Sequence, residues 1–183
     1  MTAGIEASFL RAAIRLSSQF RTERCNYNPK GGIEAVMSVL TLAQASTIVD
    51  AALKKGRETN CAPLTVAALD AGGHLVAFKR EDKSGLLRFD IAFGKAWGAL
   101  GMGFGSRTLA ERAANTPQFF TMLAAASGGR IVTNPGGVLV RDAAGDVIGA
   151  VGISGDTSDK DEACAIAGIE AAGLKADPGG SKT

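Results

Sequence analysis

The chain has 183 residues, of which 46% are hydrophobic, and 18 acidic side chains nearly balance its 20 basic ones. This composition favours one globular domain with its own apolar core. A formal net charge of +2 and 5% aromatic residues argue against a nucleic-acid-binding protein, which needs a basic surface and rings on which bases stack. Three widely spaced cysteines without a CxxC motif predict neither a disulfide framework nor a structural zinc site, and favour a cytoplasmic location.

The first 36 residues are expected to form an extension outside the domain. Arg11 and Arg15 interrupt its apolar run, so the sequence predicts neither a signal peptide nor a membrane span. Apolar residues at helical spacing over residues 5–20 predict an amphipathic helix that packs on the domain, contacts another subunit or anchors at a surface. We therefore divide the chain into an extension at 1–36, a domain at 37–175 and a flexible tail at 176–183.

A helix, a hairpin and a second helix are expected next. Thr41 and Gln44 have the spacing of a capping box ahead of an apolar stripe that ends at Gly56, which predicts a helix. Two short apolar runs joined by a glycine-containing turn predict the hairpin, at residues 64–69 and 74–78. Residues 89–100 have an apolar side typical of a helix that lies on a sheet.

The second half of the domain is expected to contain a helix, three strands and a last helix. Thr116 followed by Pro117 is typical of a helix start, and glycines 128 and 129 end that helix. Three short apolar runs predict strands, at residues 130–133, 138–141 and 147–153. A last helix begins near Ser158. The complete order predicts an α+β fold, with one antiparallel sheet of about five strands and helices over at least one of its faces.

Glycine recurs along one side of the second helix and just beyond it, at positions 94, 98, 101 and 105. Each glycine inside a helix lowers its stability by about 1 kcal/mol relative to alanine, so a close contact should compensate. Another part of the chain's backbone, a partner subunit and a flat ligand are the alternatives. The run of glycines at 101, 103 and 105 follows a helix instead of a strand, so it does not predict a dinucleotide site.

His74 is the only histidine of the chain, so any imidazole chemistry must come from this residue. It follows a tight turn that begins at Asp70, and the same pattern returns at residues 142–146 with Asp146 in place of the histidine. Because an imidazole titrates near neutral pH, His74 is a candidate general base or haem ligand, with Asp70 orienting the ring. The alternative is that both are ordinary turn residues.

Lys95 is the third candidate catalytic residue. It lies between Phe93 and Trp97 on the second predicted helix, so its ammonium group either reaches water or meets a carboxylate. Asp82 and Asp156 are the candidate partners.

Five residues in two loops are candidates for ligand binding. Arg80 and Asp82 follow the hairpin, and Arg80 belongs to a basic cluster suited to a carboxylate. Ser154, Gly155 and Asp156 end a strand and lead into a helix N-terminus, where backbone amides can bind anions. Nearby acidic residues favour a hydroxyl, an amine or a metal-bridged group over a bare phosphate, and capping of the helix by its own acids is the structural alternative.

The run LTVAALDAGGHLVAFKRED, at residues 64–82, carries a family resemblance together with Lys95-Ala96, Gly136-Gly137-Val138 and residues 149–155. These motifs resemble the GlcG/HbpS-like family, which also forms the C-terminal domain of PduO-type proteins and is often labelled a haem-degrading domain. The resemblance covers about residues 40–172. It implies a profilin-like fold, a homo-oligomer that is commonly an octamer, and a small-molecule ligand, with haem or another tetrapyrrole as the candidate cofactor. It also implies a link to glycolate or diol catabolism in some members.

Three functional hypotheses follow from these residues. The first is a small-ligand or haem-binding accessory protein, with a pocket between the His74 hairpin, the Lys95 helix and the loop at 154–158. The second is an enzyme, a lyase or isomerase for a small organic acid, in which His74 or Asp70 moves a proton and Lys95 or Arg80 holds the carboxylate. The third is an assembly factor without catalysis, whose glycine face builds an oligomer. The sequence alone leaves open whether the protein is an enzyme.

Overall fold

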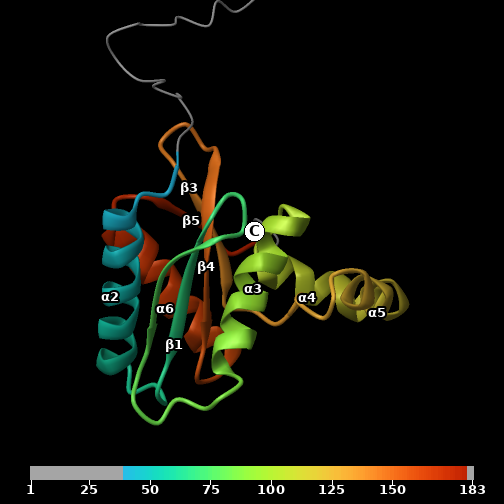
Figure 1. The fold of residues 1–183 in the computed structure, drawn as a ribbon, viewed down its shortest axis with the longest axis horizontal. Helices are drawn as coiled ribbons and strands as arrows, with labels where there is room; N and C mark the ends of the chain where they lie inside the picture. Colours follow the sequence, from blue (N-terminus) through green and yellow to red (C-terminus); the bar gives the residue numbers. More distant parts are fainter. Residues whose placement is uncertain (1–38, 181–183) are drawn as a thin grey trace, which may run out of the picture. The chain divides into compact units, whose positions relative to one another are not determined.

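The computed structural model describes residues 39–180, and these residues are organised around a five-stranded antiparallel sheet (Figure 1). The strands are β1 (Thr65–Asp70), β2 (Leu75–Arg80), β3 (Gly137–Arg141), β4 (Val147–Ser154) and β5 (Lys175–Asp177). They lie in the order β2-β1-β4-β3-β5, and each neighbouring pair is antiparallel. The arrangement confirms the predicted α+β class.

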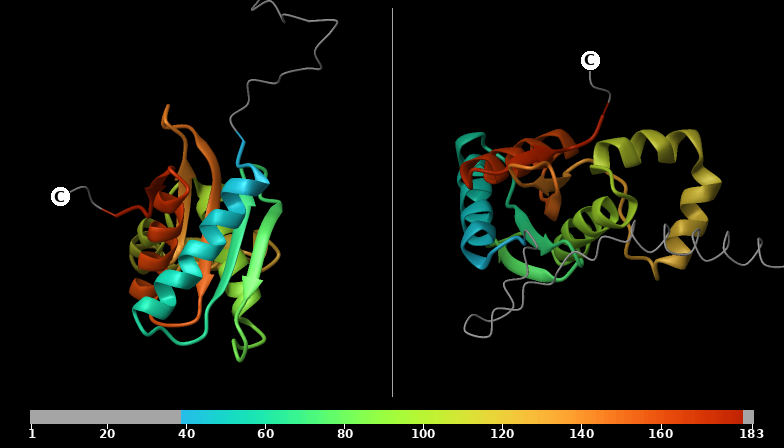
Figure 2. Two further views of the ribbon diagram at one scale, coloured as in Figure 1. Left: turned by 90° about the vertical axis from the view of Figure 1, so that its left-hand side faces the viewer. Right: turned by 90° about the horizontal axis from the view of Figure 1, so that it is seen from above.

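Helices cover both faces of this sheet. The described helices are α2 (Leu42–Glu58), α3 (Arg88–Met102), α4 (Ser106–Asn115), α5 (Pro117–Ala126) and α6 (Ser158–Ala171). α2 and α6 pack against each other on one face, and α3 packs on the other face against β1, β3 and β4 (Figure 1). α4 and α5 continue beyond α3, away from the sheet (Figure 2).

Side chains of the central strands alternate between the two helical layers. The core beneath α2 and α6 contains Val66, Ala68, Val151 and Ile153. The core beneath α3 contains Leu69 and Ala150. On the α3 side, β4 has no side chain at Gly152, where an added Cβ would lie 1.8 Å from the carbonyl oxygen of Ala92. The glycine therefore lets the backbone of α3 lie directly on the strand.

The capping box at the start of α2 is confirmed. The N–H of Gln44 donates to Thr41 Oγ1 at 3.2 Å, and the N–H of Thr41 donates to Gln44 Oε1 at 3.1 Å. The extension and amphipathic helix expected before it lie outside the described residues. Within residues 39–180, no helix is long and apolar enough to cross a membrane.

One predicted strand is wrong, and another was missed. Residues 130–133 do not join the sheet, and the N–H of Val132 instead donates to the carbonyl of Gly94 in α3 at 3.2 Å. Their apolar character reflects packing on a helix rather than on a neighbouring strand. The fifth strand is β5, where Ala176 pairs with Val140 of β3.

Helix α4 was also missed, and the described C-terminal residues lie against it. Ser106 and Leu109 are the buried residues of α4, so its sequence lacks a wide apolar stripe. Residues 178–180 lie against it: the N–H of Arg107 donates to the Pro178 carbonyl at 3.2 Å, and the N–H of Gly180 donates to Thr108 Oγ1 at 2.8 Å. The described part of the expected flexible tail is therefore bound to the domain.

Candidate functional site

His74 lies on the surface at the end of the β1–β2 turn. Asp70 Oδ1 accepts a hydrogen bond from the His74 N–H at 2.9 Å and lies 3.3 Å from His74 Nδ1. The histidine side chain is 82% exposed. The β3–β4 turn is built in the same way, with Asp142 Oδ1 accepting from the Asp146 N–H at 2.9 Å. Asp70 therefore organises the turn and also contacts the imidazole, which stays open to a ligand.

Lys95 is buried in an ion pair between helices on opposite faces of the sheet. Its Nζ lies 2.8 Å from Asp161 Oδ2 and donates to the Ile153 carbonyl at 2.9 Å. Burial lowers the pKa of Lys95 and raises the pKa of Asp161, while the attraction between the two opposes both shifts. The partner is therefore Asp161 of α6, and not Asp82 or Asp156 as the sequence suggested. At 4% and 2% exposure, the two charged side chains are closed to a ligand.

Arg80 and Asp82 line an open polar cavity of about 460 Å³ at the end of β2. Glu81 lies between them in sequence and pairs with Arg57 at 2.9 Å. Its other carboxylate oxygen accepts from the N–H of Leu64 at 2.6 Å. One of the two acidic groups of this cavity, Glu81, is thus already bound within the protein.

Ser154, Gly155 and Asp156 form a corner that is satisfied internally. Ser154 Oγ accepts from Arg88 Nη1 at 3.2 Å. An added Cβ at Gly155 would lie 2.5 Å from a backbone oxygen of the loop before β1. Asp156 accepts from a backbone N–H of that loop at 2.7 Å, and its backbone hydrogen bonds lower the pKa of Asp156 to about 2. The carboxylate of Asp156 is therefore used to hold the backbone of the chain itself.

His74 does not meet Lys95 or this corner. In the strand register, Val66 of β1 lies beside Ile153, whose carbonyl binds Lys95, whereas Asp70 lies four residues further along β1. Four residues of extended strand span about 13 Å. The prediction that the imidazole, the lysine and the corner surround one pocket is therefore wrong. Arg80, paired with Thr65, also lies at the far end from His74.

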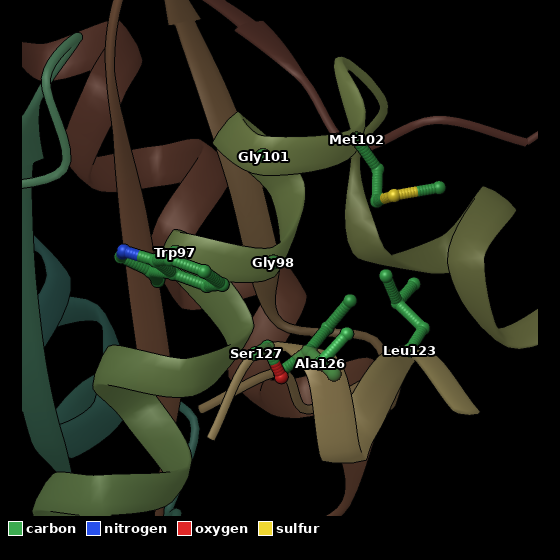
Figure 3. A pocket seen from close by; sticks show the side chains of 8 residues that line it. Trp97, Gly98, Gly101, Met102, Leu123, Ala126 and Ser127 are labelled. Carbon is green, nitrogen blue, oxygen red and sulfur yellow. The ribbon is translucent and has the colours of Figure 1, made fainter. Parts of the chain in front are cut away.

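An apolar cavity of about 200 Å³ lies instead between α3 and α5 (Figure 3). Trp97, Gly98, Gly101 and Met102 of α3 line one side, and Leu123 and Ala126 of α5 line the other. In Figure 3 the Met102 and Leu123 side chains face each other across the opening, and the indole nitrogen of Trp97 points away from them. The Ser127 hydroxyl at the rim donates to the Ala124 carbonyl at 2.9 Å. The side chains that line the cavity therefore offer an almost wholly apolar surface.

The glycine-rich side of α3 forms the floor of this cavity. An added Cβ at Gly94 would lie 2.5 Å from the Arg130 carbonyl oxygen, and one at Gly98 would lie 2.8 Å from Ile131 Cγ1. Gly105 is closed in the same way by the backbone of residue 178. Gly101 has nothing within 4 Å of an added Cβ. Three of the four glycines thus allow another segment of this chain to pack closely, and this packing offsets their lower helix propensity. Gly101 instead faces the cavity.

The His74 turn and a second cavity adjoin this site. An added Cβ at Gly73 would lie 3.1 Å from Trp97 Cδ1, so the turn carrying His74 approaches the tryptophan. A cavity of about 310 Å³ shares Met102 and continues along Phe119 and Phe120 of α5. Sequence reasoning did not identify Met102 or the residues of α5 as site residues. The available signals were the glycine periodicity and the single tryptophan beside it.

The described domain is thus an α+β domain with an antiparallel sheet covered by helices on both faces and an open apolar cavity on the α3 side. The model of the haem-degrading, HbpS-like protein family matches residues 40–170. The chain therefore belongs to the HbpS-like family.

Two solved structures have the same fold, and one further relative is similar in sequence. A crystal structure of the PduOC:haem complex has a TM-score of 0.68 and 25% sequence identity, covering 75% of this chain and 97% of that one. The Klebsiella pneumoniae protein ORFY has a TM-score of 0.66 and 30% identity, covering 73% of this chain and 90% of that one. An uncharacterised 15.0 kDa protein from the dhaT-dhaS intergenic region of Citrobacter freundii is 29% identical, over 73% of this chain and 92% of its own length.

Proposed function

We propose that this protein binds haem, or another flat and largely apolar small molecule, in the cavity between α3 and α5. The observation that carries the proposal is the open space over Gly101. Without a side chain there, a planar ring can lie against the helix backbone. The haem complex of PduOC, a relative at 25% identity, supports haem as the first ligand to test.

The chemistry of the cavity fits a tetrapyrrole. Apolar walls from Trp97, Met102 and Leu123 suit the ring, because apolar surface gains free energy when it leaves water. A thioether in the cavity, at Met102, and an imidazole on the turn beside Trp97 are both known types of haem iron ligand. Bound haem would supply the redox-active iron, while the chain supplies the apolar surface and the orientation of the ring.

The size of the cavity determines how much of the ligand it encloses. At about 200 Å³, it is smaller than the roughly 300–1,000 Å³ of most small-molecule sites. A tetrapyrrole would therefore insert one side and leave the remainder over the mouth. The adjoining cavity of about 310 Å³ extends the apolar surface in that direction.

The proposed acid–base enzyme receives less support from the geometry. That mechanism needs Lys95 or Arg80 to hold a carboxylate beside His74. Lys95 is engaged by Asp161, and Arg80 lies at the opposite end of the hairpin. We therefore favour binding without catalysis.

Haem titration of Gly101→Leu tests the proposal. Leucine at this position adds an apolar side chain to the cavity lining, and its Cβ meets no other atom, since nothing lies within 4 Å of it. The matched control is Ala43→Leu, at an exposed position of α2, on the face of the sheet opposite α3. Binding is followed by the Soret band and by quenching of Trp97, the only tryptophan of the chain.

We expect Gly101→Leu to weaken haem binding at least tenfold and Ala43→Leu to leave it within twofold of wild type. We expect His74→Ala to weaken binding less than Gly101→Leu, because His74 lies outside the cavity lining. Wild-type affinity in Gly101→Leu would refute the cavity as the haem site. Absence of both Soret and fluorescence changes with the wild-type protein would refute haem as the ligand.

A further inference from the structure

Arg112 of α4 lines the adjoining cavity, and the cationic side chain beside the α3–α5 cavity itself is Arg130. The segment that contains it lies on α3, as the Val132 N–H bond to Gly94 and the close approach of the Arg130 carbonyl show. Its guanidinium carbon lies 5.9 Å from the centre of the Trp97 ring, and Ile131, the next residue, lines the cavity. The guanidinium group is therefore held beside the wall that a bound ring would touch.

Arg130 is free to bind an anion. Most other described arginines have polar partners: Arg57, Arg107 and Arg141 pair with carboxylates, and Arg88 binds a hydroxyl. Arg130 is exposed and has neither an ion pair nor a side-chain hydrogen bond within residues 39–180. Among residues 39–180, no acidic residue lines the cavity. A negatively charged group of a ligand would therefore meet the Arg130 cation and no opposing carboxylate of this lining.

We infer that Arg130 anchors a carboxylate at the edge of the bound ring, so that the ligand is an amphipathic planar acid rather than a neutral aromatic molecule. The inference rests on the proposed binding function and specifies the ligand class. A guanidinium group presents two parallel N–H donors that match a carboxylate. Contact with the tryptophan face restricts the guanidinium group before binding, which reduces the entropy lost when the ligand is held. The apolar ring enters the cavity, and the acid stays at the mouth.

The test compares protoporphyrin IX, which carries two carboxylates, with its dimethyl ester, which has the same ring and no charge. Neither contains iron, so ligation by Met102 or His74 does not enter the comparison. Both are titrated into wild type, Arg130→Ala and Arg130→Lys, with Trp97 quenching as the measurement. Arg80→Ala tests the other candidate position for the acid, because Arg80 is also exposed, lines the polar cavity at the end of β2 and has no ion pair within residues 39–180.

A hydrogen bond to a charged group contributes about 1.5–3 kcal/mol, which corresponds to roughly a 10- to 100-fold change in affinity. We expect Arg130→Ala to weaken binding of the acid at least tenfold, Arg130→Lys to fall between it and wild type, and Arg80→Ala to have no effect. The ester should bind wild type and Arg130→Ala equally, at the weakened level.

Equal binding of acid and ester by wild type would overturn the carboxylate anchor while leaving the cavity proposal intact. An equal loss for both ligands in Arg130→Ala would also overturn it, because the arginine would then act only through packing. A loss in Arg80→Ala instead would place the acid in the polar cavity at the end of β2. Failure of both compounds and of haem to quench Trp97 would overturn the proposed function as well.

Discussion

Removing the amine of the buried Lys95–Asp161 pair should be one of the most damaging single changes in this domain. In Lys95→Met the stem is kept, but Asp161 loses a cation at 2.8 Å and the Ile153 carbonyl loses its donor at 2.9 Å. Removing one partner of a buried ion pair costs about 3–5 kcal/mol. We therefore expect the free energy of unfolding in urea at pH 7 to fall by about 3–5 kcal/mol.

The matched control is Lys54→Met. Lys54 lies 4.0 Å from Glu58 on α2, and both side chains are more than half exposed. Exposed pairs of this kind contribute about 0.3–0.5 kcal/mol, so Lys54→Met should leave the unfolding midpoint nearly unchanged. The contrast between two lysine-to-methionine changes isolates the effect of burial.

The double variant Lys95→Met with Asp161→Asn tests the cause of the loss. The asparagine removes the uncompensated charge and can still accept from the N–H of Asp156, which Asp161 Oδ1 binds at 3.1 Å. The second substitution should restore at least about 2 kcal/mol, giving strong non-additivity. A loss below about 1 kcal/mol in Lys95→Met, or additive effects in the double variant, would refute this account of the pair.

The loss in Lys95→Met should also depend on pH. Burial raises the pKa of Asp161 even beside the lysine, and without the lysine this pKa should rise further. A carboxyl whose folded-state pKa is raised lowers stability above its unfolded pKa, and this penalty disappears as falling pH protonates the group in the native state. The difference between Lys95→Met and wild type should therefore shrink between pH 7 and pH 4. A difference that stays constant over this range would contradict a buried carboxylate as the source.

Four further outcomes are expected. The pKa of Asp156 is lowered to about 2, so the ionised carboxylate stabilises the folded state above pH 4 and this stabilisation is lost as the pH falls toward 2. Asp156→Asn should therefore make the free energy of unfolding depend less on pH in this acidic range. Gly152→Ala should destabilise the domain by more than 2 kcal/mol, since its Cβ would lie 1.8 Å from an α3 carbonyl, on the scale of overpacked cores at about 1–3 kcal/mol. Gly101→Ala should raise the thermal midpoint, because helix propensity improves by about 1 kcal/mol. Cys61 and Cys164 are both buried, and burial raises the pKa of Cys164 to about 12. In a Cys25→Ser background these two thiols should therefore react with a thiol reagent at pH 8 only after unfolding.

Local sequence patterns predicted the helices and turns that are specified by residues close together in the chain. The capping box at Thr41 and Gln44, the hairpin turn at Asp70 and the proline at the start of α5 each act through hydrogen bonds or backbone angles within a few residues. The missed helix α4 has few buried side chains, so its sequence lacks the periodicity that reveals a packed helix. Strand β5 has three residues, which is too short for a pattern.

The candidate site was harder to predict because it depends on tertiary contacts. Nothing near Lys95 in sequence indicates that Asp161 lies beside it, since the two are separated by β3, β4 and two further helices. Asp82 and Asp156 were candidate partners of Lys95 only because each carries a carboxylate, and no local pattern placed either of them beside the lysine. The glycines of α3 did indicate a close approach, but whether another segment or an open space meets each glycine depends on the course of residues 130–132. Sequence periodicity located the surface and could not distinguish its filled part from its empty part.

The β1–β2 and β3–β4 turns, which begin at Asp70 and Asp142, have the same construction but different fifth residues, His74 and Asp146. The comparison shows which features of position 74 the turn itself requires. Each turn has an acid at its first residue and a glycine with positive φ at its fourth, Gly73 at 80° and Gly145 at 97°, and the fifth residue donates its backbone N–H to that acid. The His74 side chain adds one contact, from Nδ1 to Asp70 Oδ1 at 3.3 Å, and it is 82% exposed. Aspartate occupies that fifth place in the second turn. Proline at position 74 would lose the N–H that binds Asp70. Apart from proline, a saturation library at this position should give nearly uniform cellular abundance, and an amino-acid preference in a parallel selection for ligand capture would report mainly on recognition.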